Sequence, residues 1–249
     1  MKRPVFAANW KMNHGPTDAR EFLRAFLAHY PRQHDRSVVF FPPALTLHAV
    51  VEGVRERSDI AVGVQNIYWE DKGAFTGELS ASIARDAGAR LVLVGHSERR
   101  HVFGERDEDT GKKCQAAVRA GLTPMLCVGE TIAEREQGRT DEVVLRQLRA
   151  GIAGLTPAQV SGMLVAYEPV WAIGTGKTAT PDDAAAVHAV IRNALRVVVA
   201  DDAPKVPILY GGSVNRANAP TLVSAQNVDG LLVGGASLDA GGWAAIARA

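Results

Sequence analysis

Glu168, His96 and Lys11 have the residue types that could move a proton next to a carbonyl group. Glu168 lies in segment 166–171, whose other residues are apolar or aromatic. We expect its carboxylate to be poorly solvated, which would raise its pKa and suit a general base. His96 precedes a sequence consistent with a helix start, where the helix dipole disfavours imidazolium and favours a neutral hydrogen-bond donor. A base, a neutral donor and the Lys11 cation together suit proton abstraction beside a carbonyl, because the donor and the cation stabilise the enediolate oxygen.

Three glycine-containing segments could bind a phosphate group. Because glycine has no Cβ, backbone N–H groups in such segments can approach an anion closely. Tight turns are the alternative explanation, and for the pair 211–212 both explanations stay open. The segments are 174–176, 211–213 and 234–235.

Segment 174–178 ends like a nucleotide-binding P-loop, but the rest of that motif is missing. The motif needs a glycine five residues before Gly176, and that position holds Trp171. The apolar tip 171–173 instead lies between a stiff Pro169 and a flexible Gly-Thr-Gly. This composition is typical of a lid that closes over a substrate and excludes water.

Short apolar runs alternate with longer amphipathic segments along the whole chain. The runs are rich in Val, Ile and Leu with little polar alternation, as in strands of a parallel sheet that are buried on both faces. The expected strands are Val5–Ala8, Val38–Phe41, Ile60–Val64, Leu91–Val94, Pro124–Val128, Met163–Tyr167, Pro207–Tyr210 and Gly230–Val233. The clearest expected helices are Asp18–Tyr30, Leu45–Arg57, Asp107–Ala120, Thr140–Ile152 and Pro181–Ala200.

Several of these helical segments carry end signals. Thr180 precedes a proline and two aspartates, which suit the unpaired N–H groups and the dipole of a helix N-terminus. Gly88 and Gly121 each follow a helical pattern, as glycines that terminate helices do. These signals support the boundaries of the repeated strand–helix units.

The repeat predicts one α/β domain, residues 1–249, folded as a closed (β/α)8 barrel. Eight units share 249 residues, about 31 each, which is the size of a βα unit. No linker or shift in composition interrupts the series. An open doubly wound sheet is the alternative, but it usually has a glycine-rich phosphate turn after the first strand. Here that strand ends in Asn9-Trp10-Lys11.

The candidate residues follow the carboxyl ends of the expected strands, where barrels place their active sites. Taken singly, each has an ordinary structural explanation, such as a solvated lysine or a capping histidine. Their joint placement on one rim favours an active site, because chance would scatter them to both ends. They are Asn9 and Lys11 after strand one, Gln65 and Asn66 after strand three, His96 to Glu98 after strand four, Glu168 after strand six, Ser213 after strand seven, and Gly234 and Gly235 after strand eight.

Composition argues against several other classes of protein. The 28 Lys and Arg residues nearly balance 27 Asp and Glu, so charge gives no case for nucleic acid or a membrane surface as partner. The two cysteines, Cys114 and Cys127, form no CxxC pair or metal-type cluster. Asn9 and Lys11 interrupt the N-terminus before a signal peptide could form, and no run is long enough to span a membrane. We therefore expect a cytoplasmic protein without a metal site.

The chain resembles the triosephosphate isomerase family along its whole length. The lid segment carries part of the resemblance: Pro169, Val170, Trp171, Ala172, Ile173, Gly174, Thr175, Gly176, Lys177, Thr178 and Ala179. The other matching segments are 9–13, 95–100, 127–130, 210–214 and 233–238. The resemblance implies a TIM barrel that interconverts dihydroxyacetone phosphate and D-glyceraldehyde 3-phosphate through an enediolate, in glycolysis and gluconeogenesis. It also implies that no cofactor or metal takes part.

The resemblance implies a role for each matching site residue. Glu168 would be the base that carries the proton between adjacent carbons, and His96 the neutral electrophile. Lys11 and Asn9 would hold the substrate and its developing negative charge. The phosphate would bind backbone N–H groups of Gly174, Ser213, Gly234 and Gly235. Behind these groups would lie Glu98 as the partner of Lys11, Tyr210 as a latch for the closed lid near Ala179, and Cys127.

Members of this family are usually homodimers, and segment 73–78 resembles their docking loop. It would insert Thr76 into the neighbouring subunit beside Asn9 and Lys11, and dimerisation would give Phe75 an apolar environment. Trp69 departs from the family pattern next to this loop. Two other functions stay open from the residues: phosphate elimination from the same enediolate, against which the lid argues, and a barrel recruited for binding, against which the complete rim argues.

Overall fold

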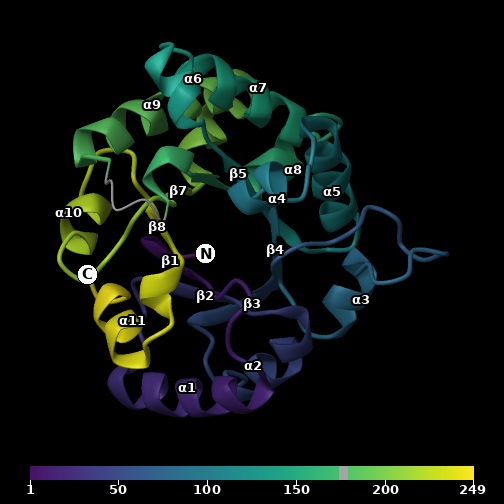
Figure 1. Cartoon of the computed structure of the whole chain (residues 1–249), viewed down its shortest axis with the longest axis vertical. Helices are drawn as coiled ribbons and strands as arrows, with labels where there is room; N and C mark the ends of the chain where they lie inside the picture. Colours follow the sequence, from purple (N-terminus) through teal and green to yellow (C-terminus); the bar gives the residue numbers. More distant parts are fainter. Residues whose placement is uncertain (174–178) are drawn as a thin grey trace.

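The eight strands form a closed parallel barrel surrounded by helices (Figure 1). The structure, a computed structural model, describes residues 1–173 and 179–249. Neighbouring strands pair in chain order, and β8 pairs with β1 to close the barrel. The strands are β1 (Val5–Asn9), β2 (Ser37–Phe41), β3 (Ile60–Val64), β4 (Leu91–Val94), β5 (Thr123–Val128), β6 (Leu164–Tyr167), β7 (Ile208–Tyr210) and β8 (Gly230–Val233).

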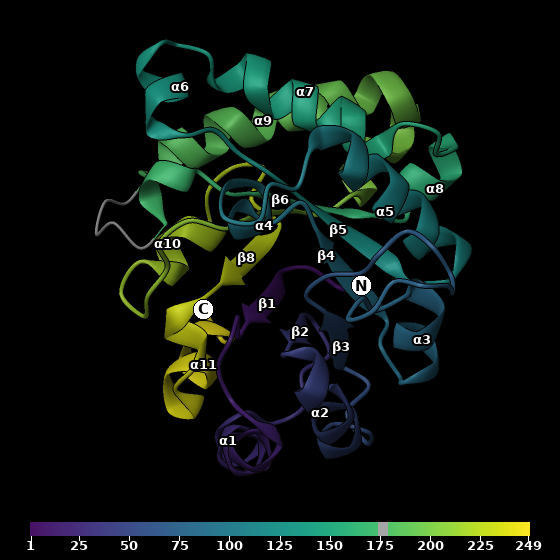
Figure 2. The same cartoon turned by 45° about the vertical axis from the view of Figure 1, so that its right-hand side comes forward.

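Helices of very different length cover the outside of the barrel. Figure 2 shows α7 and α9 together along one flank, where they pack on each other. The α-helices are α1 (Pro16–His29), α2 (Leu47–Gly53), α3 (Ala81–Asp86), α4 (Ser97–His101), α5 (Asp107–Arg119), α6 (Ile132–Glu136), α7 (Thr140–Ile152), α8 (Pro157–Ser161), α9 (Pro181–Val199), α10 (Ala219–Val223) and α11 (Ala240–Ile246). Short 3-10 turns are η1 (Ala44–Thr46), η2 (Val170–Ala172), η3 (Ala200–Lys205) and η4 (Gly235–Ser237).

Closure of the barrel confirms the fold expected from the repeat and excludes the open sheet. All eight expected strands are present, and no end is shifted by more than one residue. One helix prediction is wrong in extent: segment 45–57 holds the end of η1 and then α2, which stops at Gly53. A glycine there weakens the helix through its backbone freedom. Several helices of five to seven residues were not expected, because so few turns carry no readable periodicity.

The residues expected to start and end helices make the predicted contacts and backbone turns. The Thr180 hydroxyl accepts from the backbone N–H of Asp183 at 3.1 Å, and the Asp183 carboxylate accepts from the Thr180 N–H at 3.0 Å. Gly88 and Gly121 have positive φ angles of 100° and 76° after α3 and α5. The capping box fixes the start of α9 just after the lid segment.

Two apolar layers hold the barrel together, because successive strand residues point to opposite faces. Phe6 and Ala8 of β1 face the surrounding helices, in the larger core. Val5 and Ala7 of the same strand face the barrel interior. Gly63 leaves room inside for the Phe41 ring, since a Cβ there would lie 2.4 Å from Cε1 of that ring. The filled interior makes the barrel a rigid support for its rim.

The helices of the described residues give no sign of a membrane segment. None of them combines the length and the apolar character needed to cross a bilayer.

Candidate active site

A cavity of about 400 Å³ opens at the carboxyl ends of the strands. It brings together residues from both ends of the chain, as barrel closure requires. Its lining contains Asn9, Lys11, His96, Glu168, Ile173, Gly211, Gly212, Ser213, Val214, Leu232, Gly234, Gly235 and Ala236. The predicted catalytic residues and the predicted phosphate-binding residues outside segment 174–178 therefore all lie in one place.

Glu168 and His96 are in direct contact in this cavity. Glu168 follows β6, is only 2% exposed, and places Oε1 3.0 Å from Nε2 of His96. Its other carboxylate oxygen, Oε2, accepts from the backbone N–H of Ser97 at 2.9 Å. Ser97 is the first residue of α4, so the N-terminus of that short helix holds the carboxylate. Both carboxylate oxygens are thus engaged.

The hydrogen bonds of His96 place its single proton on Nε2. Nδ1 accepts from the backbone N–H of Glu98 at 3.2 Å, with His96 acting as the cap of α4. A neutral imidazole has one donor and one acceptor nitrogen, so Nε2 donates, and Glu168 accepts. The amide Nδ2 of Asn9 lies 3.1 Å from the same Nε2 atom. Two N–H donors therefore lie side by side in the cavity.

The sequence predicts a raised pKa for Glu168, and this prediction is wrong. Burial alone would raise it, but His96, the Ser97 N–H and the Lys11 charge outweigh burial and lower the pKa of Glu168. Burial alone would likewise lower the pKa of His96, and the Glu168 carboxylate outweighs it and raises that pKa. The sequence showed the apolar neighbours of Glu168 but not the donors brought to it from other strands.

Lys11 is held in place from three directions. Its Nζ lies 2.6 Å from Oε1 of Glu98, its backbone N–H donates to Oδ1 of Asn9 at 3.0 Å, and its carbonyl accepts from Nε2 of Gln65 at 2.8 Å. Its φ angle of 52° is unusual for a residue with a side chain. The structure thus brings Glu98 to Lys11, as the resemblance implied.

Gly211 makes room for the Glu168 side chain. A Cβ at Gly211 would lie 2.9 Å from Cγ of Glu168, and one at Gly212 would lie 2.1 Å from the Tyr210 hydroxyl. The sequence of this pair was consistent with phosphate binding or tight turns and gave no sign of the packing role. Ser213, Gly234 and the start of η4 line the same end of the cavity.

The described part of the lid is anchored on Glu130. Trp171 of η2 donates from Nε1 to Oε1 of Glu130 at 2.9 Å, and the Tyr167 hydroxyl lies 3.1 Å from both carboxylate oxygens. The Arg135 guanidinium lies 4.4 Å from the Trp171 ring centre. In the sequence Glu130 belongs to the matching segment 127–130, and nothing there indicates its anchoring role. The predicted lid tip, Gly174, Thr175, Gly176, Lys177 and Thr178, lies outside the described residues, and so does the phosphate role of Gly174.

Tyr210 and Cys127 lie behind the cavity. Burial raises the pKa of Tyr210 to about 12, and the backbone N–H of Ala179 opposes this rise. Among the described residues the Tyr210 hydroxyl has no partner in hydrogen-bonding geometry, so its latch role stays a prediction. Burial and the nearby Glu168 charge raise the pKa of the Cys127 thiol well above its usual value.

An apolar groove of about 610 Å³ runs beside the cavity. Met12, Val102 and Phe103 line it and are 95%, 71% and 65% exposed. Lys11, His96 and Glu98 also line it, so the groove borders the candidate catalytic groups. Exposed apolar side chains gathered in one groove are typical of a protein–protein contact.

The loop between β3 and α3 projects from the side of the barrel (Figure 1). Phe75 in this loop is 41% exposed. The Tyr68 ring packs on Phe75 with centres 4.7 Å apart and stacks on Trp69 at 4.1 Å, while Nζ of Lys112 lies 4.7 Å from the Trp69 ring. Trp69, the departure noted in the sequence, therefore supports this loop.

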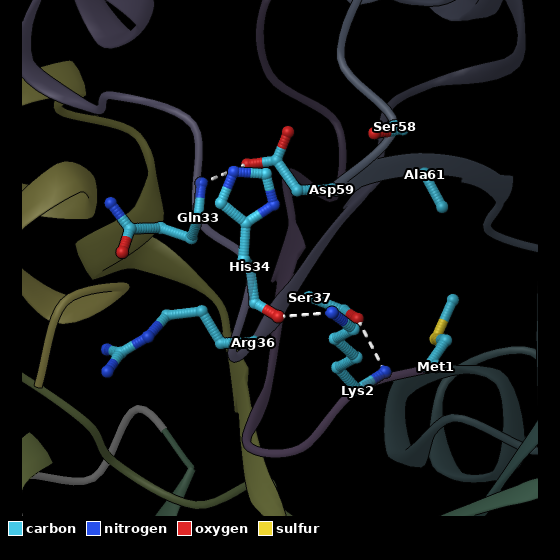
Figure 3. Close-up of a pocket in the computed structure, with 9 residues that line it drawn as sticks. All are labelled: Met1, Lys2, Gln33, His34, Arg36, Ser37, Ser58, Asp59 and Ala61. Atoms are coloured by element: carbon cyan, nitrogen blue, oxygen red, sulfur yellow. Dashed lines mark hydrogen bonds between the residues drawn. The ribbon is translucent and has the colours of Figure 1, made fainter.

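A larger cavity, about 470 Å³, lies at the opposite end of the barrel (Figure 3). Its polar groups pair with one another: the Lys2 backbone N–H donates to Oγ of Ser37, and the Gln33 N–H donates to Oδ2 of Asp59, each at 3.0 Å. None of the sequence-predicted site residues that the structure describes lines it. We therefore assign the chemistry to the smaller cavity at the carboxyl rim.

Comparison with known proteins agrees along the whole chain. A family model described as Triosephosphate isomerase matches residues 4–249. The triosephosphate isomerase of Moorella thermoacetica is 49% identical over 246 residues, covering 99% of this chain and 98% of that protein. The one from Roseiflexus sp. is 48% identical over 241 residues, covering 96% and 94%. A crystal structure of triosephosphate isomerase from Bartonella henselae matches with a TM-score of 0.88 at 39% identity, covering 98% and 97%.

Fold and site together define an aldose–ketose isomerase built on a TIM barrel. The cavity holds a carboxylate, an imidazole and an ammonium group on one rim, as proton transfer beside a carbonyl requires. The chain belongs to the triosephosphate isomerase family.

Proposed function

We propose that Glu168 carries a proton between adjacent carbons as this chain interconverts dihydroxyacetone phosphate and D-glyceraldehyde 3-phosphate. The observation that carries the assignment is the convergence of Nε2 of His96 and Nδ2 of Asn9, 3.1 Å apart, beside the Glu168 carboxylate. Once Oε1 of Glu168 leaves Nε2, these two neighbouring donors suit one substrate oxygen. Family membership supports the reaction, and this geometry supports the residue roles.

The first step replaces the contact between Glu168 and His96. A substrate carbonyl oxygen that accepts from Nε2 of His96 takes the place of Oε1 of Glu168. The released carboxylate then leaves the Ser97 N–H and moves toward the substrate carbon. Because it has lost two donors, its pKa rises, and it becomes a stronger base.

Proton transfer then proceeds with its charge balanced at each step. Glu168 takes the proton from carbon, and the C–H electron pair moves to give an enediolate. His96 and Asn9 donate hydrogen bonds to the enediolate oxygens, and Lys11 supplies positive charge. Nε2 of His96 gives its proton to the charged enediolate oxygen and takes the hydroxyl proton from the other oxygen, so a carbonyl forms on the carbon whose oxygen lost that proton. Glu168 returns its own proton to the neighbouring carbon. The Glu98 N–H on Nδ1 keeps His96 a neutral donor, since an imidazolium would direct a proton at that N–H.

Ser213, Gly234 and Gly235 supply the phosphate end of the site, with Gly174 added from the lid. The first three line the cavity beside Glu168 and Lys11. In barrels the segments after strands seven and eight commonly bind phosphate through backbone N–H groups. The lid segment closes over this end and keeps water from the enediolate.

The working molecule is a homodimer in which segment 73–78 of one copy occupies the apolar groove of the other. The groove borders Lys11 and His96 and exposes Met12 and Phe103. Phe75 projects on its own loop and would be covered by docking. Thr76 would then lie beside Asn9 and Lys11 of the neighbouring copy.

Kinetics of Glu168→Gln test the assignment. The amide keeps the shape of the side chain but cannot accept the proton, so we expect kcat to fall at least ~10²–10⁴-fold. Glu136→Gln, at an exposed position on α6, is the matched control and should keep full activity. Near-normal turnover by Glu168→Gln would contradict the assignment. Methylglyoxal as the main wild-type product would favour the phosphate lyase instead.

A further inference from the structure

Glu105 and Lys113 form a buried ion pair that the proposed mechanism does not use. Oε2 of Glu105 lies 2.5 Å from Nζ of Lys113, and the two side chains are only 2% and 5% exposed. Removing two charges from water costs solvation that their attraction often fails to recover. A buried pair of this kind is therefore weak support for stability, and its other contacts indicate what it does.

The free oxygen of Glu105 holds the residue before His96. Oε1 accepts from the backbone N–H of Gly95 at 2.9 Å. Gly95 connects the end of β4 to His96 with a φ angle of 70°. A Cβ there would lie 2.6 Å from Nη2 of Arg100 and 2.9 Å from Cγ2 of Thr110. The turn into His96 therefore depends on a glycine in a left-handed conformation.

Arg100 holds the other side of the same residue. Its Nε donates to the Gly95 carbonyl at 2.7 Å, and its Nη2 donates to the Cys127 carbonyl of β5 at 3.1 Å. Its Nη1 pairs with Asp107 at 2.6 Å, and only 6% of the side chain is exposed. A buried carboxylate thus binds the N–H of Gly95 while a buried guanidinium binds its C=O.

The ion pair is itself fixed on its far side. Nζ of Lys113 donates to Oδ1 of Asn66 at 2.7 Å, and Nε of Arg99 lies 3.3 Å from Oε2 of Glu105. Glu105 therefore has little freedom to move away from Gly95. Charge-assisted hydrogen bonds are the strong ones in a site of low dielectric constant, so this arrangement sets the Gly95 backbone firmly.

We propose that Glu105 is a positioning residue for the isomerase reaction: it fixes the Gly95 backbone and thereby the direction of Nε2 of His96. Lys113 balances the charge of Glu105 so that the carboxylate can be buried at this point. The inference rests on the proposed role of His96 as the donor to the substrate oxygen. A small rotation of that donor matters, because misplacement by about 1 Å can cost roughly 100-fold in rate.

Two double variants separate the effect of the hydrogen bond to the Gly95 N–H from the effect of burying the charged pair. Glu105→Gln with Lys113→Met is neutral and keeps an oxygen that can accept from the Gly95 N–H. Glu105→Leu with Lys113→Met is equally neutral and has no acceptor. We expect the Leu variant to lose roughly 10- to 100-fold in kcat, with KM within about two-fold of wild type, and the Gln variant to recover most of that loss.

A spectroscopic measurement adds a result that a purely structural role would not give. The imidazole nitrogen shifts of His96, measured by 15N NMR, should change in the Leu variant and stay close to wild type in the Gln variant. Thermal unfolding of both variants reports stability separately. If the Leu variant fails to fold, hydrogen exchange of the Gly95 amide in the wild type and the Gln variant tests the proposal instead. We expect this amide to exchange slowly in both proteins. Fast exchange in the wild type would overturn the proposal.

The other outcomes are also decisive. Equal kcat in both double variants, at wild-type level or equally reduced, would overturn the proposal, because the acceptor on Gly95 would then make no difference. The proposed role of His96 has its own test in His96→Gln. If His96→Gln keeps full turnover, the catalytic assignment is wrong; if it loses turnover while the Leu variant does not, only the positioning role of Glu105 is wrong.

Discussion

Oε1 of Glu168 and Nε2 of His96 lie 3.0 Å apart, so the proposed base and the proposed electrophile hold each other in this structure. The contact keeps a buried carboxylate paired where burial alone would make it costly. It also occupies the direction in which His96 would donate to a substrate. Binding of substrate and release of the base are therefore one event, because a single oxygen exchanges for another at Nε2.

The ion pair between Lys11 and Glu98 should support turnover. Its 2.6 Å separation is short, although both side chains are partly exposed. We expect Glu98→Gln to lower kcat/KM about ten-fold, the loss of one charge-assisted hydrogen bond. Steady-state kinetics check this, with Glu21→Gln on the exposed face of α1 as control. An unchanged kcat/KM would show that Lys11 needs no partner.

His188 should make the protein less stable in mild acid. Burial lowers its pKa from 6.5 to about 4, while its Nδ1 donates to the Asn227 carbonyl at 3.0 Å. In the unfolded chain the imidazole binds a proton below pH 6.5, and in the folded protein only below about 4. The unfolded state is therefore favoured progressively as pH falls from 6.5 to 4, by up to about 3 kcal/mol.

Denaturant unfolding between pH 4 and 7 checks the His188 prediction. His188→Phe keeps an aromatic ring but cannot titrate, so its free energy of unfolding should depend less steeply on pH. Val197→Ala, at an exposed position without a titratable side chain, is the control and should leave the slope unchanged. Parallel pH dependence of wild type and His188→Phe would mean that other groups cause the acid sensitivity.

Shortening the lid should divert the enediolate to phosphate elimination. Deleting residues within 172–176 exposes the intermediate to water and releases the phosphate end of the site. We expect the ratio of methylglyoxal to isomerised product to rise, measured by product analysis. Trp171→Phe removes the Nε1 donor to Glu130 but keeps an apolar ring, so it should shift the ratio less. If the product ratio stays unchanged in both variants, the lid does not protect the enediolate from phosphate elimination.

Trp69 should strengthen the proposed homodimer through the loop that it supports. Trp69→Ala removes the ring that stacks on Tyr68 at 4.1 Å and lies under Lys112. An aromatic pair contributes about 1 kcal/mol, so we expect the dimer dissociation constant to rise about five- to ten-fold.

Light scattering over a range of dilutions measures this constant. Val197→Ala, at an exposed position on α9, is the control. A wild-type mass near 26.5 kDa at every concentration would contradict the dimer itself.

The sequence by itself determined that the fold is a barrel and which residues lie at its carboxyl rim. Strands buried on both faces need apolar runs such as Leu91–Val94, and that requirement is local, so it can be read without the structure. Residues that follow parallel strands must meet at one end of the barrel. For that reason the positions of Asn9, His96 and Glu168 predicted one cavity, and the structure confirms that they line it.

Only the tertiary structure decided how those residues act on one another. The lowered pKa of Glu168 depends on His96 and Ser97, which follow β4, and on Lys11, which follows β1. Ser97 is 71 positions from Glu168 in the chain. The hold of Glu105 on Gly95 and the space that Gly211 leaves for Glu168 are likewise set by contacts across the closed barrel. Sequence patterns report each residue's own neighbours, whereas hydrogen bonds and charge in a buried site depend on distances that exist only once the strands have closed.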